Sequence, residues 1–254
     1  MNLNNPDTRQ QLLSDRVQAG AQLIAKDLAQ EFDVSLDTIR RDILALVAKG
    51  KARRTRGGAI PVAEPARPLA VKLSAGVTVK PALIDAALTE IGDTKTILVD
   101  GGTTTLALVT QLSPSPGRLV MTPSPWIAIA CQDKGIEVFI LGGTLSPQGG
   151  IATGHSALSQ MQTVTADIAI LGACGIESRF GLSSDDYAEA MMKRAMHDAA
   201  SKTIVVTDAS KIGQRARHQT LALSQIDTII TDAAPSQTDP LVNAGTQVTT
   251  PFSS

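Results

Sequence analysis

Three apolar patterns with a helical period occupy the first 50 residues, at residues 9–17, 23–32 and 35–47. In each pattern, apolar side chains recur at steps of three and four residues, which places them on one face of a helix. Ser35 stands at the N-cap position of the third pattern, and Asp37 lies in its first turn, where a carboxylate interacts favourably with the helix dipole. Lys49 and Gly50 follow the last apolar position, as is common where helices end. The pattern therefore predicts three helices.

The pattern changes after residue 58 and again after residue 80. Pro61, Pro65 and Pro68 disfavour a helix, so we predict an extended linker over residues 59–79. Short runs rich in Val and Ile then alternate with helical patterns, which is typical of a parallel sheet covered by helices on both faces. The predicted strands are residues 96–100, 119–122, 137–141, 167–171, 203–207 and 227–231, with a last short strand near 247–249. The predicted helices between them are residues 81–91, 104–112, 125–134, 156–163 and 185–200.

Composition agrees with such a sheet. Apolar residues make up 43% of the 254 residues but aromatic residues only 2%, so the core must consist mainly of Val, Ile, Leu and Ala. Aliphatic side chains suit parallel strands that are buried on both faces. No apolar stretch approaches the roughly 18 residues of a membrane helix, and the polar N-terminus does not resemble a secretory signal. We expect a cytoplasmic protein without membrane contact.

The two cysteines give no sign of special chemistry. Cys131 and Cys174 lie far apart, and neither has a partner at metal-ligand spacing. We expect both to be small buried apolar side chains. We expect no metal and no cofactor.

Charge is distributed unevenly along the chain. The net charge is −1, but residues 1–60 hold ten Lys and Arg against seven Asp and Glu, whereas the remainder holds thirteen against seventeen. A small basic segment joined to an acidic one suggests that the basic segment binds a polyanion.

Residues 23–50 have the layout of a helix-turn-helix. The second predicted helix ends near Phe32, a short turn follows, and the third begins at Ser35. In such a motif the N-terminal residues of the recognition helix contact base edges. Arg40 and Arg41 lie on this helix and Thr38 lies near its start; an arginine that binds guanine with two hydrogen bonds contributes about 1–3 kcal/mol of discrimination.

A cluster of cations follows the third helix directly. Together with Gly57 and Gly58 it predicts a short β-hairpin wing that contacts phosphates, formed by Lys49, Lys51, Arg53, Arg54 and Arg56. The alternative is a solvated helical hairpin, or a module that docks onto another protein. Arginines on the second helix of the motif and again in the wing favour DNA.

The run VSLDTIRRDILALVAKGKARRTRGGA resembles the signature of the DeoR family of transcriptional regulators, continuously through Ala59. The resemblance implies that base-reading residues are Ser35, Thr38, Arg40 and Arg41. Arg56 stands where the family commonly has His before Gly-Gly, which retains a hydrogen-bond donor. Asp42 is expected to orient an arginine, because a carboxylate repels phosphate.

The run ILVDGGTTTLALVTQL, residues 97–112, is the strongest chemical motif in the second part of the chain. A buried strand ends at Asp100, Gly101 and Gly102 permit a tight turn, and three threonines then open a helix. Backbone N–H groups and hydroxyls at a helix N-terminus form an anion site suited to phosphate. Alternatively, Asp100 and the threonines only cap the helix. The absence of a G-x-x-x-x-G-K-[ST] run argues against a nucleoside triphosphate.

Four further runs place polar residues just past a predicted strand: VMTPSPW, ILGGTL, ILGACGIE and IVVTDASKIG. Ligands bind at the carboxyl ends of strands in open α/β sheets. In the last run, Lys211 supplies a cation for a phosphate, and Asp208 supplies a carboxylate for a sugar hydroxyl. The alternative for these two is a surface ion pair beside a turn.

This second part resembles the DeoR-family sensor domain, which is similar in fold to ribose-5-phosphate isomerase. The resemblance covers residues 80–233 and rests on Lys80, DGGTTT, TPS, LGG, ADIAILGACGI, YAEAMMKRAM and TDASKIG. It implies an effector pocket lined by Lys80, Asp100, Gly102, Thr103, Thr104, Thr105, Asp208 and Lys211. Pro123 replaces an Asn that is common in the family, and Ser124 is expected to take its role. Glu189 and Lys193 lie four apart on one predicted helix, so they either belong to this site or form an ordinary surface ion pair.

We therefore expect an α/β protein with a winged helix-turn-helix at residues 1–58, a linker at 59–79 and a doubly wound, mostly parallel α/β sensor domain at 80–254. The expected function is repression of carbohydrate or polyol genes, with double-stranded operator DNA, a small phosphorylated metabolite and a second copy of the chain (dimer or tetramer) as partners.

Two alternatives remain, an interaction module that binds no DNA and a sugar-phosphate isomerase. Asp100, Asp185, Asp186 and Asp208 are candidate bases for an isomerase. No committed acid–base pair stands out, and the scattered His155, His197 and His218 look structural.

Overall fold

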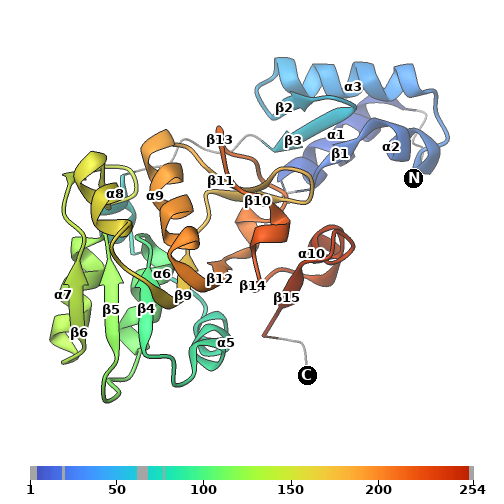
Figure 1. Cartoon of the computed structure of the whole chain (residues 1–254). Helices are drawn as coiled ribbons and strands as arrows, with labels where there is room; N and C mark the ends of the chain where they lie inside the picture. Colours follow the sequence, from blue (N-terminus) through green and yellow to red (C-terminus); the bar gives the residue numbers. More distant parts are fainter. Residues whose placement is uncertain (1–4, 19–20, 62–67, 77, 252–254) are drawn as a thin grey trace.

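The computed structural model describes residues 5–18, 21–61, 68–76 and 78–251. It has a small N-terminal head and a larger α/β body, and the head lies against one end of the body (Figure 1). Within the described ranges, no helix combines the length and the apolar character that crossing a bilayer requires.

The head contains three helices and a three-stranded antiparallel sheet. The helices are α1 (Pro6–Gln18), α2 (Ala25–Glu31) and α3 (Leu36–Ala48), and the strands are β1 (Leu23–Ile24), β2 (Ala52–Thr55) and β3 (Gly58–Pro61), in the order β1-β3-β2. The predicted helical faces form its core, which includes Leu13, Leu28, Ile39 and Leu46. The hairpin between β2 and β3 turns at Gly57, whose φ of +105° suits a residue without a Cβ. The predicted helix-turn-helix and wing are thus both present.

The segment predicted as a linker contains regular structure at both of its described ends. It begins inside β3, and residues 69–74 form the short helix α4 (Leu69–Ser74). Leu69 is buried, and its backbone N–H donates to the Pro147 carbonyl at 3.2 Å. Residues 62–67 and 77, and with them Pro65, lie outside the described residues. The chain therefore packs onto the body from Leu69 onward.

A seven-stranded, entirely parallel sheet forms the centre of the body, in the order β15-β14-β12-β9-β4-β5-β6. Its strands are β4 (Thr96–Val99), β5 (Leu119–Thr122), β6 (Glu137–Ile140), β9 (Ala166–Leu171), β12 (Ala200–Thr207), β14 (Thr228–Thr231) and β15 (Gln247–Thr249). Successive strands β4, β5 and β6 extend to one side, and β9, β12 and β14 to the other. The order therefore reverses between β4 and β9, which is the position where open α/β sheets bind ligands.

Helices cover both faces of this sheet. On one face lie α5 (Pro81–Ile91), α6 (Thr103–Gln111) and α7 (Pro125–Asp133); on the other lie α8 (His155–Met161), α9 (Tyr187–Asp198) and α10 (Pro235–Val242). Each face has its own aliphatic cluster, built around residues such as Ile97 and Val206 on the first and Leu98 and Val205 on the second. Adjacent strand residues alternate between the two clusters, as expected for strands buried on both sides.

A separate antiparallel sheet lies beside α9, on the side of the body nearest the head (Figure 1). It consists of β10 (Gly175–Glu177), β11 (Gly181–Ser184) and β13 (His218–Leu221). The remaining described elements are the hairpin strands β7 (Thr144–Leu145) and β8 (Ala152–Thr153) and the 3-10 turns η1 (Ala209–Lys211) and η2 (Leu223–Gln225).

The doubly wound α/β fold predicted from the sequence is confirmed. All seven predicted strands of the parallel sheet are present, and their ends differ from the predicted ones by three residues at most. The sequence did not indicate the antiparallel strands or α10, which carries Pro240 in its interior.

Candidate functional site

The recognition helix α3 presents its predicted reading residues to solvent. Ser35 caps it by accepting from the Thr38 N–H at 3.1 Å, and the two hydroxyls lie 2.8 Å apart. Arg40 and Arg41 are both exposed. Among the described residues, Arg40 pairs with Asp37, at 3.3 Å, and the two side chains are 61% and 76% exposed. Neither arginine is needed for packing, so both remain available to a ligand.

Asp42 lies on the opposite, buried side of α3. Its Oδ2 is 2.5 Å from Arg9 Nε, and its Oδ1 accepts from the Gln10 side-chain amide at 3.1 Å. As expected from the sequence, Asp42 orients an arginine, and this arginine belongs to α1.

A groove of about 660 Å³ runs between α3 and the wing. Its lining includes Arg40 and Leu44 from α3 and Arg54 and Arg56 from the wing. Leu44 is 44% exposed and offers an apolar surface in this groove. The sequence did not single it out, because it directly follows the core residue Ile43. Cations on both walls and an apolar side chain in one of them suit a DNA strand, with phosphates against guanidinium groups and an apolar contact to a base.

The remaining three predicted wing cations contact protein groups. Lys49 Nζ donates to Gln10 Oε1 of α1 at 3.4 Å. Lys51 Nζ donates to Ser14 Oγ of α1 at 3.2 Å. Arg53 Nη2 donates to the backbone carbonyl of Arg215, in the segment between β12 and β13 of the body. Arg53 therefore ties the wing to the body.

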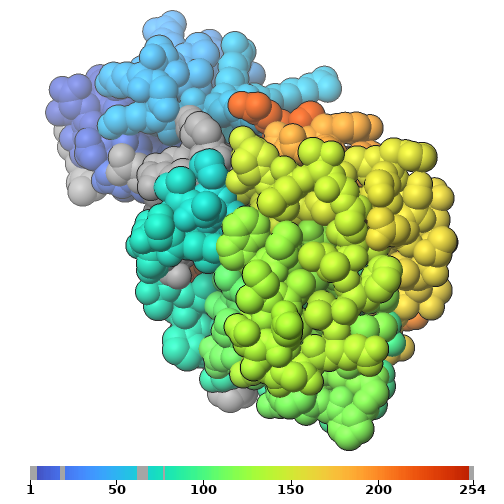
Figure 2. Space-filling view, turned by 90° about the vertical axis from the view of Figure 1, so that its left-hand side faces the viewer, coloured from blue at the N-terminus to red at the C-terminus, as the bar shows by residue number. Residues whose placement is uncertain are grey.

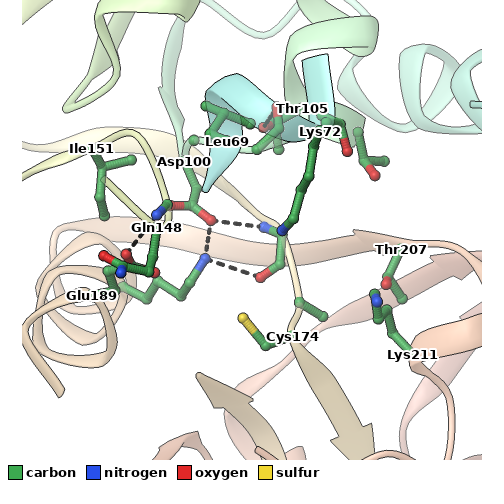
Figure 3. A pocket seen from close by; sticks show the side chains of 18 of the residues that line it. Leu69, Lys72, Asp100, Thr105, Gln148, Ile151, Cys174, Glu189, Thr207 and Lys211 are labelled. Atoms are coloured by element: carbon green, nitrogen blue, oxygen red, sulfur yellow. Dashed lines mark hydrogen bonds and ion pairs between the residues drawn. The ribbon is translucent and has the colours of Figure 1, made fainter. Parts of the chain in front are cut away.

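A second candidate site lies in the body where the strand order reverses. The pocket encloses about 100 Å³ and is lined by the carboxyl ends of β4, β9 and β12 together with α4, α6, α9 and the loop at Gln148 (Figure 3). It brings together seven of the predicted effector residues: Asp100, Gly102, Thr103, Thr104, Thr105, Asp208 and Lys211.

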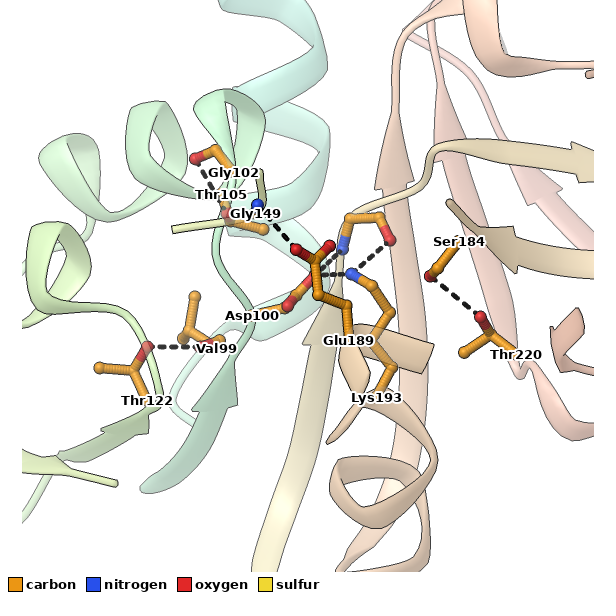
Figure 4. Close-up of polar contacts among 11 residues, drawn as sticks. Val99, Asp100, Gly102, Thr105, Thr122, Gly149, Ser184, Glu189, Lys193 and Thr220 are labelled. Carbon is orange, nitrogen blue, oxygen red and sulfur yellow. Dashed lines mark hydrogen bonds and ion pairs between the residues drawn. The ribbon is translucent and has the colours of Figure 1, made fainter. Parts of the chain in front are cut away.

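Asp100 and Lys193 form a buried ion pair at the base of this pocket (Figure 4). Lys193 Nζ also donates to the Gly172 carbonyl at 3.1 Å, and Asp100 Oδ2 accepts from the Gly172 N–H at 3.0 Å. Burial by itself lowers the pKa of Lys193, but the negative groups around it, Asp100 first, outweigh burial and raise that pKa above its ordinary value. Lys193 therefore stays charged at neutral pH. Asp100 Oδ1 is buried without a hydrogen-bond partner among the described residues, so a ligand hydroxyl would satisfy it.

Glu189 lies one helical turn before Lys193 and faces the same pocket. Its Oε1 accepts from Ser146 Oγ at 2.6 Å and from the Gly149 N–H at 2.7 Å. The Cβ of any residue replacing Gly149 would lie 2.6 Å from this carboxylate, so the close approach requires glycine. Glu189 and Lys193 thus bind separate partners inside the pocket and do not form the surface ion pair that their spacing alone permitted.

The N-terminus of α6 supplies backbone donors. Gly102 precedes the helix with a φ of +135°, and the first intrahelical bond runs from the Leu106 N–H to the Gly102 carbonyl. The N–H groups of the three threonines before Leu106 have no acceptor within the helix. They and the positive end of the helix dipole favour an anion here.

Besides Lys193, two lysines line this pocket, and among the described residues neither of these two makes an ion pair. Lys211 was predicted, whereas Lys72 of α4 was not. Figure 3 shows Lys72 reaching into the middle of the pocket and Lys211 on the side opposite Glu189. Asp208, next to Lys211 in the predicted motif, caps η1 by accepting from the Ser210 N–H at 2.8 Å. The pocket therefore has a cationic side and a side with bound carboxylates.

Two predicted effector residues lie outside the pocket lining. Lys80 Nζ is 2.7 Å from Asp232 Oδ2, and Asp232 accepts from the Ala209 N–H at 2.7 Å, so Lys80 supports the loop that carries Lys211. Ser124 is fully buried, with its Cβ 3.5 Å from the position that a Cβ on Gly101 would take. Its Oγ has no described partner. Both residues lie behind residues that line the pocket.

Comparison with known proteins agrees with this two-part layout. The model of the DeoR-like helix-turn-helix domain matches residues 9–64, and the model of the DeoR C-terminal sensor domain matches residues 77–233. The chain is 32% identical to the HTH-type transcriptional regulator GlpR of Haloferax volcanii over 82% of each chain. It is 28% identical to the glycerol-3-phosphate regulon repressor of Escherichia coli, over 83% of this chain and 84% of that one.

A solved structure of D-ribose-5-phosphate isomerase in complex with phospho-erythronic acid aligns over 51% of each chain, with 18% identity and a TM-score of 0.37. The domain matches and the extent of the relatives define the chain as a transcriptional regulator that joins a DNA-binding head to a sensor domain. It belongs to the DeoR family.

Proposed function

We propose that the chain is a sequence-specific repressor of carbohydrate or polyol metabolism genes, released from its operator by a small phosphorylated sugar or polyol. Residues 1–58 bind DNA, residues 59–79 connect the two parts and contribute Lys72 to the effector pocket, and residues 80–254 supply the rest of that pocket. The relative named as a glycerol-3-phosphate regulon repressor supports this class of regulon. The observation that carries the proposal is a pocket at the strand-order reversal in which two unpaired lysines flank a helix N-terminus.

The proposed DNA binding depends on exposed arginines in two places, the recognition helix and the wing. Arg40 and Arg41 project from α3, where they reach base edges, while Arg54 and Arg56 line the other wall of the same groove, where they reach phosphates. Ser35 and Thr38 sit at the start of α3, the part of a recognition helix that contacts bases.

The effector part rests on the division of the pocket into two sides. The threonine N–H groups of α6, Lys72 and Lys211 bind the phosphate, because helix N-termini and lysines are established phosphate ligands. Asp100 and Glu189 accept hydrogen bonds from hydroxyl groups at the other side. The small volume, about 100 Å³, favours a short phosphorylated chain over a nucleotide.

We also propose that the repressor acts as a homo-oligomer. The edge strand β6 exposes Phe139 and Ile140, 43% and 48% accessible, and the adjacent α7 exposes Ile129. An exposed apolar sheet edge offers a template for pairing with another chain. Light scattering on the purified protein tests this, with Phe139→Glu as the variant expected to lower the measured mass.

The function is tested by titrating the protein onto its own upstream DNA and onto random DNA at several salt concentrations. We expect tighter binding to the upstream DNA and release when a phosphorylated sugar or polyol is added, but not when its dephosphorylated form is added. Equal affinity for both DNAs, or release by neither compound, contradicts the proposal.

The same compounds test the isomerase alternative, since turnover without DNA binding would favour an enzyme. Two of the candidate bases have structural roles, because Asp186 caps α9 and Asp208 caps η1. We therefore expect binding without turnover.

A further inference from the structure

A second cationic groove lies between the wing and the body. It measures about 270 Å³, and five arginines line it: Arg53, Arg54 and Arg56 from the wing, and Arg215 and Arg217 from the segment between β12 and β13. Figure 2 shows this segment, in orange-red, directly against the light-blue wing. The groove thus combines guanidinium groups from both parts of the chain.

The body side of the groove is held in place by specific contacts. The Arg215 guanidinium lies over the Phe180 ring, 3.5 Å from its centre. The neighbouring Ala216 N–H donates to Ser183 Oγ of β11 at 2.9 Å. Arg53 donates to the Arg215 carbonyl, which joins the wing to the same segment. The arginines are therefore presented by a braced backbone.

The charges in the groove are not balanced. No Asp or Glu is among the described residues that line it. Burial and the positive charge of Arg215 lower the pKa of Arg53 from its ordinary value, and only Asp185 opposes them. Guanidinium groups pair well with the oxygens of phosphate because their donors form a planar fork. An anion in the groove would offset the mutual repulsion of its cations.

The two grooves share the wing as a common wall. Arg54, Thr55 and Arg56 line both this groove and the groove beside α3. A DNA backbone that follows the wing past α3 therefore reaches Arg215 and Arg217 next.

We infer that the sensor domain itself contacts operator DNA, with Arg215 and Arg217 completing a site for a backbone phosphate beneath the wing. This inference rests on the proposed DNA-binding function. The ligand is a phosphate of duplex DNA, so the contact adds affinity for any sequence and no sequence preference. The sequence motifs ended at Ala59 and gave no sign of a DNA contact from the body.

The test compares Arg217→Gln and Arg215→Gln with the native full-length protein, using fluorescence anisotropy with operator and random DNA from 50 to 300 mM KCl. Each phosphate contact contributes about 0.9 to the slope of log K against log salt. We expect each variant to lower that slope by about this amount on both DNAs. Arg217 is exposed, so its substitution leaves folding intact, and the contact that Arg53 makes to the Arg215 backbone does not depend on the Arg215 side chain.

Two further variants separate the possible failures. Lys95→Gln removes one positive charge outside the groove, where Lys95 Nζ bonds Ser115 Oγ at 3.0 Å, and it should leave the slope unchanged. If Lys95→Gln lowers the slope by the same amount, the cause is a general effect of net charge, and the inference is overturned. An unchanged slope in both groove variants, with a reduced slope in Arg54→Gln, would overturn the inference and leave the proposed function standing. If the slope is also unchanged in Arg54→Gln, the result would contradict both the inference and the proposed DNA-binding function.

Discussion

Asp42 of α3 and Arg9 of α1 form an ion pair in the core of the head, with Arg9 Nε 2.5 Å from Asp42 Oδ2 and both side chains at most 5% exposed. The pair joins the recognition helix to α1. It also turns the only carboxylate in the Ile-Arg-Arg-Asp run away from any DNA.

Asp42→Ala should destabilise the head strongly. Removing one partner of a buried ion pair costs about 3–5 kcal/mol of unfolding free energy. Chemical denaturation followed by circular dichroism measures this loss. Asp37→Ala is the matched control, since its pair with Arg40 is exposed and should change stability by less than about 1 kcal/mol. Equal, small changes in the two variants would contradict a structural role for Asp42.

Arg40→Ala and Arg54→Ala should weaken DNA binding in different ways. Loss of a base contact removes about 1–3 kcal/mol of discrimination, so Arg40→Ala should lower the ratio of the affinity for operator DNA to the affinity for random DNA. In the proposed assignment, Arg54 contacts a phosphate, so Arg54→Ala should lower the affinity for operator and random DNA alike. Competition binding at fixed salt distinguishes the two patterns. The same pattern in both variants would defeat the assignment of base and phosphate roles.

Lys211→Ala and Lys72→Ala should separate sensing from DNA binding. A hydrogen bond to a charged group contributes about 1.5–3 kcal/mol, so effector affinity should fall roughly 10- to 150-fold while operator affinity without effector stays the same. Thermal shift with a phosphorylated polyol measures effector binding, because ligand binding raises stability with concentration. Lys95→Ala serves as the control. Release from DNA at the native effector concentration in either variant would exclude that lysine from the site.

The two cysteines should differ in reactivity. Burial raises the pKa of Cys131 to about 11, and this thiol is fully buried. Burial also raises the pKa of Cys174, with nearby Lys193 opposing it. The sequence predicted that Cys174 is buried, but it lines the pocket of the body and is partly exposed. Iodoacetamide should therefore label Cys174 first, faster as pH rises because the thiolate is the nucleophile, and more slowly when the pocket is filled. Peptide mass spectrometry gives the sites. Faster labelling of Cys131, or no protection by any ligand that stabilises the protein, would contradict this placement.

Regular patterns made most of the fold predictable. The helical period of the head and the Val- and Ile-rich runs of the body reflect faces that must be buried, so the sequence alone gave their positions to within a few residues. The antiparallel strands were not predictable in this way. Residues 181–184 read GLSS, and this stretch is fully buried by β13 and α9, which no local pattern records.

The pocket shows a similar limit. Asp100 and Lys211 follow strands at the same edge of the sheet, so their proximity could be inferred from topology. Lys72 belongs to a six-residue helix after a proline-rich stretch, and tertiary packing, including that against α6, brings it to the pocket. Lys80 was predicted to line the pocket, but its ion pair with Asp232 holds it behind the loop that carries Lys211.

The stretch between β12 and β13 carries Lys211 near its start and Arg215 near its end, and the Gly213 N–H between them donates to the Ile176 carbonyl at 2.8 Å. In a repressor built this way, one short segment takes part in two binding equilibria, and linked equilibria are reciprocal. If the bound metabolite lowers the affinity for the operator by some factor, the bound operator lowers the affinity for the metabolite by the same factor. The protein bound to its operator then has a lower affinity for the metabolite than the free protein. The metabolite concentration needed for release therefore rises with the affinity of each operator for the protein.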